Sequence, residues 1–118
     1  MKNKPKILIL GALGQIGSVL TSNLGEIYGY SNVIASDIKQ CPSGNFFKGP
    51  FEITDATSYD QLYKMVQKHS IDTVYLMAAM LSAKAEKQPE RAWHLNMSSL
   101  FNVLNLAKNG YILSLIHI

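Results

Sequence analysis

The stretch K-I-L-I-L-G-A-L-G-Q-I-G, residues 6–17, decides the fold that we expect for this chain. Its first half is an unbroken apolar run, which is typical of a strand buried on both faces of a parallel sheet. Its second half is a glycine loop with the spacing G-x-x-G-x-x-G, at Gly11, Gly14 and Gly17. Apolar residues at helical spacing follow, so the pattern predicts a strand, a glycine turn and a helix over Gln15–Tyr28.

The rest of the chain continues this alternation of short apolar runs and helical patterns. Short strands are expected at residues 32–37, 51–53 and 72–78, and helices at about 59–69 and 89–108. A capping-box pattern at Ser58 and Gln61 marks the start of the second helix, and Asn109-Gly110 ends the third. The order predicts an α/β fold with a parallel sheet, right-handed crossovers and the strand order 3-2-1-4.

Periodicity also predicts which side chains are buried. In the second helix, Leu62, Met65 and Val66 are expected to face the core. In the third, Trp93 and the methionine side chains are interpreted as part of a core stripe. The histidines at positions 69 and 94 show no metal-ligand spacing and are expected at the surface.

The composition bounds the function. The chain has 118 residues, of which 47% are hydrophobic and 16% charged, as in one globular domain. No apolar run approaches the roughly 20 residues that span a bilayer, and the start lacks a signal-peptide pattern. We therefore expect a cytoplasmic protein with no membrane partner. The net charge of +3 comes without a basic, aromatic-rich stripe, so no nucleic acid partner is expected. A single cysteine, Cys41, excludes a disulfide framework and a cysteine-based zinc site, and no metal site is predicted.

The glycine loop has the chemistry of a phosphate site. Gly11 lets the chain turn sharply after the strand, Gly14 lets a phosphate approach the backbone, and Gly17 lets the helix pack close to the sheet. The start of the helix offers free N–H groups and a partial positive charge to a pyrophosphate. Asp37, at the end of the second strand, can accept hydrogen bonds from both ribose hydroxyls of adenosine.

The carboxylate of Asp37 would repel a 2′-phosphate, so the residues favour NAD over NADP. From the residues alone, two alternatives stay open. The glycines can form a tight turn without a ligand, and Asp37 can be a helix cap or a solvated acid.

The G-x-x-G-x-x-G spacing resembles that of extended short-chain dehydrogenases/reductases, the superfamily of nucleotide-sugar epimerases and dehydratases. Several segments resemble the short-chain type of L-threonine 3-dehydrogenase more closely. They are G-A-L-G-Q-I-G at residues 11–17, V-I-A-S-D-I at 33–38, G-P-F-E-I at 49–53, Y-L-M-A-A-M-L-S-A-K-A-E at 75–86 and A-W-H-L-N-M-S-S-L-F-N-V-L-N-L-A-K at 92–108. This resemblance implies the amino-terminal half of a Rossmann-type doubly wound domain.

The resemblance also implies a reaction and a set of cofactor contacts. The family oxidises L-threonine to 2-amino-3-ketobutyrate with NAD. We expect the full-length parent of this chain to be a homodimer. Ser82 would face the substrate amino acid, and Asn96 would support the site from the following helix. A loop cap for Ser82 and a purely structural role for Asn96 remain alternatives. The implied cofactor contacts are Gly11, Gly14, Gln15, Ile16, Gly17, Asp37, Ile38, Glu52, Ile53, Leu76, Ala78 and Ala79, with Glu52 acting largely through its backbone.

The superfamily's catalytic pair, Tyr-x-x-x-Lys, is missing from these 118 residues, and no catalytic residue is predicted in them. In the family, the tyrosine takes the hydroxyl proton and the lysine lowers its pKa. None of the six tyrosines has a lysine four positions later: Tyr28, Tyr30, Tyr59, Tyr63, Tyr75 and Tyr111. We therefore expect this chain to be inactive by itself.

The last six residues, L-S-L-I-H-I at 113–118, depart from the family pattern. They match a translation of the mosaic-end adapter of transposase-based sequencing libraries. We expect residues 1–112 to be a truncated NAD-binding domain and residues 113–118 to be non-native. Because the tail is apolar and β-favouring, it is suited to act as a fifth strand beside the fourth.

Two other functions stay open at this point. One is a nucleotide-sugar epimerase or dehydratase of the same superfamily, which would differ in the missing substrate half. The other is a non-catalytic NAD-sensing module of the same fold. A Tyr-x-x-x-Lys pair in a longer reading frame would argue against the second.

Overall fold

The computed structural model describes residues 4–38, 48–77 and 87–117. The sequence forms the expected alternation of strands and helices, with one additional short 3₁₀ helix, η1. In chain order, the elements are β1 (Ile7–Leu10), α1 (Gln15–Tyr28), η1 (Tyr30–Asn32), β2 (Val33–Asp37), β3 (Phe51–Ile53), α2 (Tyr59–His69), β4 (Thr73–Leu76), α4 (Pro89–Lys108) and β5 (Ser114–His117).

The five strands form one parallel sheet in the order β3-β2-β1-β4-β5. The predicted order 3-2-1-4 is therefore confirmed, and the tail does form a fifth strand beside β4. Leu10 pairs with Ser36 on one side and with Leu76 on the other. This register aligns the carboxyl ends of β1, β2 and β4 at one edge of the sheet, where open α/β folds bind their ligands.

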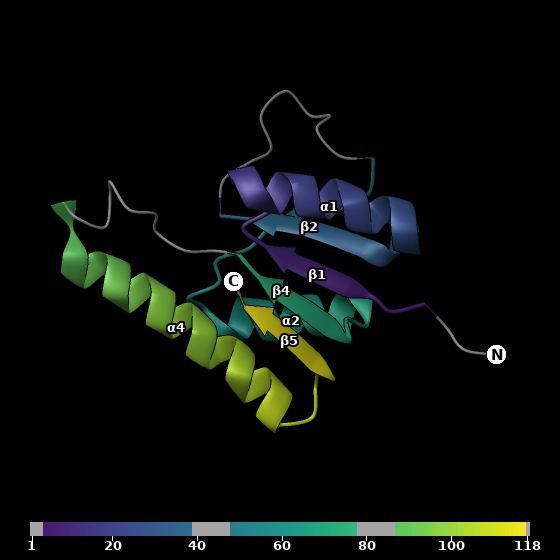
Figure 1. The fold of residues 1–118 in the computed structure, drawn as a ribbon. Helices are drawn as coiled ribbons and strands as arrows, with labels where there is room; N and C mark the ends of the chain where they lie inside the picture. The colour runs from purple at the N-terminus through teal and green to yellow at the C-terminus, as the bar shows by residue number, and fades with distance from the viewer. Residues whose placement is uncertain (1–3, 39–47, 78–86, 118) are drawn as a thin grey trace.

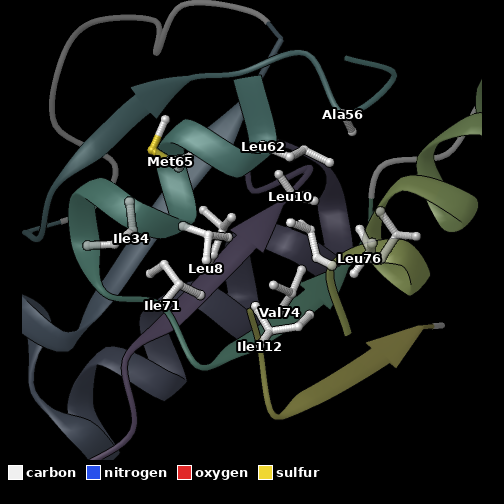
Figure 2. Close-up of a cluster of buried hydrophobic side chains, with 13 residues drawn as sticks. Leu8, Leu10, Ile34, Ala56, Leu62, Met65, Ile71, Val74, Leu76 and Ile112 are labelled. Carbon is white, nitrogen blue, oxygen red and sulfur yellow. The ribbon is translucent and has the colours of Figure 1, made fainter. Parts of the chain in front are cut away.

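Helices cover the sheet on two faces, as Figure 1 shows: α1 lies on one face, and α2 and α4 lie on the other. Alternate residues of β1 divide between these layers, because successive side chains of a strand point in opposite directions. Ile7 and Ile9 pack with Leu24 of α1. Leu8 and Leu10 belong to the larger cluster, drawn in Figure 2, which includes Leu62, Met65 and Val66 of α2 as predicted.

Local chemistry fixes the ends of the helices. The Ser58 hydroxyl accepts a hydrogen bond from the Gln61 N–H at 3.3 Å, as the capping pattern predicts. The Gln61 side chain, however, accepts from the N–H of Asp55 at 2.9 Å and not from that of Ser58. At the end of α4, Gly110 takes a φ of 80°, a left-handed conformation that suits glycine.

The apolar stripes of α1 and α4 are only partly packed. Along α1, Ile16, Val19 and Ile27 are exposed, whereas Leu24 is buried against the sheet, with Leu20 and Tyr28 partly buried beside it. The prediction that Trp93 belongs to a core stripe is wrong, because its side chain is 68% exposed. A helical period shows which residues share a face, but it does not show whether a second layer covers that face.

Candidate functional site

The glycine loop is tied to the end of β2 by three consecutive backbone amides. The N–H groups of Gly11 and Ala12 both donate to the carbonyl oxygen of Ser36, each at 2.9 Å. The N–H of Leu13 donates to the Asp37 side chain, with 3.1 Å between the nitrogen and Oδ2. The loop and the acid that the sequence singled out therefore lie against each other, although 24 residues separate Leu13 from Asp37.

Two of the three glycines are required by the geometry of the loop itself. Gly11 has a φ of 90°, which side chains other than hydrogen rarely tolerate. A Cβ on Gly17 would lie 2.2 Å from the carbonyl oxygen of Gly11, so only glycine lets α1 start this close to the turn. A Cβ on Gly14 would make an ordinary contact of 3.5 Å with the same oxygen. Gly14 is therefore not needed for packing, which leaves its exposed backbone as the surface that a ligand could approach.

The first turn of α1 presents free amide groups at this surface. The first helical hydrogen bond runs from the Ser18 N–H to the Gly14 carbonyl at 2.9 Å. The N–H groups of Gln15, Ile16 and Gly17 precede it and have no acceptor within the helix. Gly14, Gln15 and Ile16 are exposed, and the first turn contains no acidic residue. The arrangement suits a diphosphate, because the positive end of the helix dipole points at the same surface.

Asp37 provides acceptors next to this anion site. Its Oδ2 accepts from Leu13, and its Oδ1 accepts from the N–H of Ile38 at 2.8 Å. A carboxylate is a hydrogen-bond acceptor at both oxygens, the chemistry that the hydroxyls of a ribose require. The side chains of Ile38 and Ile53 are 60% and 56% exposed, and Ile53 is paired in register with Asp37. Donors for phosphate, acceptors for ribose and apolar surface for a base thus follow one another along the sheet edge, and these residues fit a dinucleotide.

The side chain of Glu52 is engaged elsewhere. Its Oε2 lies 2.8 Å from Lys68 Nζ and 2.5 Å from His69 Nε2, at the end of α2. The hydrogen bond from Lys68, supported by the one with His69, holds the pKa of Glu52 below its ordinary value. Any contact of Glu52 with a cofactor would therefore come from its backbone. His69, which the sequence analysis placed at the surface, is largely buried by this contact, with 19% of its side chain exposed.

The predicted cofactor contact at the end of β4 is Leu76. The Leu76 side chain is 1% exposed and packs in the larger core cluster, so it faces away from the sheet edge. The chain then continues from Met77, whose N–H donates to the Leu10 carbonyl at 2.8 Å. The predicted contacts Ala78, Ala79 and Ser82 lie outside the described residues. Asn96 is half-buried in α4.

One polar contact beside the candidate site is not predicted by the sequence analysis. Asn102 Nδ2, on α4, donates to the carbonyl oxygen of Ala56 at 3.0 Å. Ala56 belongs to the loop between β3 and α2, whose first amide, that of Thr54, donates to the Asp37 carbonyl at 2.9 Å. Helical periodicity could not identify this contact, because it joins residues 46 positions apart.

In the described part of the chain, no helix combines the length and the hydropathy needed to cross a membrane. In the same residues, no three or more His, Cys, Asp or Glu side chains come together in a group that could hold a metal ion.

Several solved structures share both sequence and fold with this chain. A partial consensus L-threonine 3-dehydrogenase is 50% identical, with a TM-score of 0.89 over 94% of this chain and 35% of its own. The holo form of a GalE-like L-threonine dehydrogenase from Cupriavidus necator is 47% identical, with a TM-score of 0.87 over the same shares. A UDP-glucose-4-epimerase from Stenotrophomonas maltophila with bound NAD is 21% identical, with a TM-score of 0.82, and shows a likeness of fold alone.

A curated relative is described as an uncharacterized epimerase/dehydratase of Staphylococcus aureus (strain USA300). It is 47% identical over 104 residues, which make up 87% of this chain and 32% of the relative. The chain therefore spans about a third of the length of the proteins it matches. The model of the NAD dependent epimerase/dehydratase family matches residues 7–118. With the sheet order, the glycine loop and Asp37 arranged as described, this match shows that the chain belongs to the NAD dependent epimerase/dehydratase family.

Proposed function

We propose that this chain forms the NAD-binding part of an L-threonine 3-dehydrogenase. The observation that supports the proposal is the hydrogen bond from the Leu13 amide to Asp37, because a carboxylate beside a glycine loop is suited to accept from the ribose of a dinucleotide. When bound, NAD supplies the hydride acceptor. Gln15 and Ile16 would hold its pyrophosphate with their amides, Asp37 its adenosine ribose, and Ile38 and Ile53 its adenine.

The reaction belongs to the longer parent. Its substrate is proposed from the L-threonine dehydrogenases that are 44–50% identical to this chain. The parent would oxidise L-threonine to 2-amino-3-ketobutyrate, as a cytoplasmic homodimer with a small-molecule substrate. The general base would come from residues outside these 118, because no tyrosine here is followed by a lysine four positions later.

Binding of NAD is the first test. NAD is titrated into the 118-residue chain by calorimetry, beside the variant Gly14→Trp, whose indole would cover the exposed turn. We expect the unmodified chain to bind and the variant to lose binding. Equal binding by the two chains would contradict the assignment of the glycine loop.

Substrate is the second test. A longer reading frame that contains this sequence would be expressed and assayed for NADH formation with L-threonine. An epimerase or dehydratase is the second candidate, favoured by the description of the Staphylococcus aureus relative. Turnover of a UDP-sugar without threonine oxidation would support that candidate and contradict ours.

An NAD-sensing module is the third candidate. A catalytic parent would carry a Tyr-x-x-x-Lys pair, which these 118 residues do not contain. A Tyr-x-x-x-Lys pair in the longer reading frame would count against an NAD-sensing module. The longer reading frame would also test our proposal that residues 113–118 are non-native.

A further inference from the structure

Asn102 is the polar link between α4 and the sheet edge that carries the candidate site. Its side-chain amide reaches the Ala56 carbonyl oxygen at 3.0 Å. Ala56 is 7% exposed and shares a hydrophobic cluster with Val103, the next residue of α4. The helix therefore holds this part of the loop by apolar packing and by one hydrogen bond.

Several other hydrogen bonds of residues 54–58 are made within the loop or to its neighbours. The Thr54 amide donates to the Asp37 carbonyl, and the Asp55 amide donates to the Gln61 side chain. The Asp55 side chain accepts from both the N–H and the hydroxyl of Thr57, at 2.9 and 2.7 Å. The loop is thus internally braced, so we expect a shift at one end to displace the other end as well.

The end of the loop nearest the sheet lies beside the proposed adenosine contacts. Thr54 follows Ile53 directly, and its amide is bonded to the backbone of Asp37. Removing the Asn102 donor would leave the Ala56 carbonyl without that partner in a largely buried position, which favours displacement of the loop. We expect this displacement to move Ile53 and Asp37 more than it moves the glycine loop.

We propose that Asn102 is a positioning residue for the adenosine half of the bound dinucleotide. It acts by holding loop 54–58 against the carboxyl end of β2, and it touches neither cofactor nor substrate. This inference rests on the proposed binding of NAD. It goes further than that proposal, because α4 has no cofactor contact in the described site. The inference assigns to α4 an effect on the affinity for the adenosine half of NAD.

The decisive variant is Asn102→Asp, which keeps the shape of the side chain and replaces the donor with an acceptor. The matched control is Asn105→Asp, which makes the same change of charge at an exposed position one turn along α4. Dissociation constants for NAD and for inorganic pyrophosphate are measured by calorimetry, with hydrogen exchange of the loop amides and the melting temperature. Asn102→Gln is included because it keeps a carboxamide donor on a longer stem.

We expect Asn102→Asp to weaken NAD about tenfold, to leave pyrophosphate affinity within twofold and to speed exchange at Thr54 and Asp55. Asn105→Asp should match the unmodified chain, and Asn102→Gln should recover part of the NAD affinity.

An equal loss for NAD and pyrophosphate would overturn the proposal in favour of general unfolding. Faster loop exchange with unchanged NAD affinity would also overturn it, because the bond would then be structural only. If the unmodified chain binds pyrophosphate but not NAD, the proposed function fails. The role of Asn102 is then judged by hydrogen exchange alone. Equal exchange of the loop amides in Asn102→Asp and Asn105→Asp would show that Asn102 does not hold the loop.

Discussion

The carboxylate of Asp37 accepts a hydrogen bond from the backbone N–H of Leu13, with 3.1 Å between Oδ2 and the nitrogen. One side chain therefore has two tasks. It fastens the glycine loop to β2, and in the proposed function it also accepts hydrogen bonds from the ribose of a dinucleotide. Substitutions that separate these two tasks give the sharpest test of the site.

The first prediction concerns the choice of cofactor. Asp37→Ala removes both tasks and should weaken NAD at least about tenfold, since hydrogen bonds to a charged acceptor are lost. Asp37→Asn keeps an acceptor for Leu13 but removes the charge, so it should narrow the preference for NAD over NADP. Calorimetry with both dinucleotides measures this, with Asp60→Ala, an exposed acid paired with Lys64, as the control. Equal affinity of the unmodified chain for NAD and NADP would show that Asp37 is wrongly assigned.

The second prediction distinguishes two glycines of the loop. Gly17→Ala would place a Cβ 2.2 Å from the Gly11 carbonyl oxygen, where backbone must move. Overpacking costs up to about 3 kcal/mol, and alanine returns about 1 kcal/mol of helix propensity. We therefore expect a net loss of about 2 kcal/mol in the free energy of unfolding, measured by urea denaturation.

Gly14→Ala is the matched comparison, because its Cβ would make an ordinary contact of 3.5 Å. It should leave stability within about 0.5 kcal/mol and reduce NAD affinity instead. A reversal of the two effects would mean that Gly14 is the packing glycine and Gly17 the ligand-facing one.

The sequence could predict the sheet because apolar runs and glycine spacing are local signals. The apolar run at residues 6–11 forms β1, which pairs with β2 (Val33–Asp37). The apolar residues 113–118 supply β5, as expected. Strand ends were less predictable. The expected strand at 72–78 is observed as Thr73–Leu76, because pairing with β1 determines its length, and β1 ends at Leu10.

The site was predictable only where a residue type implies its own chemistry. The glycines and Asp37 carry such signals. Asn102 does not, because its role depends on a carbonyl 46 residues away. The sequence predicted that Glu52 lies near the adenine, but it did not predict the ion pairs of its side chain. Lys68 and His69 reach Glu52 from the end of α2, and no pattern of neighbouring residues signals such a contact.

The third prediction concerns the pH dependence that Glu52 confers. Its hydrogen bonds with Lys68 and His69 lower the pKa of the carboxyl in the folded chain, whereas the unfolded chain keeps an ordinary value of roughly 4.3. The stabilisation is therefore fully present above the unfolded value and is lost as pH falls through the lowered folded value. Glu52→Gln should be less stable than the unmodified chain at pH 7, and the difference should shrink on acidification through this window. Urea denaturation across pH, with the exposed Glu90→Gln as control, measures it. A constant difference at all pH values would exclude an electrostatic contribution.

The fourth prediction is that the 118-residue chain does not oxidise L-threonine. Holding a cofactor orients a reaction but supplies no general base. The measurement is NADH absorbance with L-threonine and NAD, with Gly14→Trp as the blank. Turnover above that blank would place a catalytic group within these residues, contrary to our reading of the tyrosines.

The last prediction concerns the edge of the sheet formed by β5. Leu115 packs against the larger core cluster, whereas Leu113 is 87% exposed. Leu115→Asp should unfold the chain or destabilise it by about 2 kcal/mol or more, because a charge would enter an apolar contact. Leu113→Asp introduces the same charge two residues away and should instead raise the monomeric fraction. An exposed apolar edge strand is a template for pairing between chains, so we expect the unmodified chain to associate. Size exclusion and thermal unfolding, with and without NAD, measure these outcomes. A monodisperse monomer that melts cooperatively above about 50 °C would show that the five-stranded sheet is stable by itself.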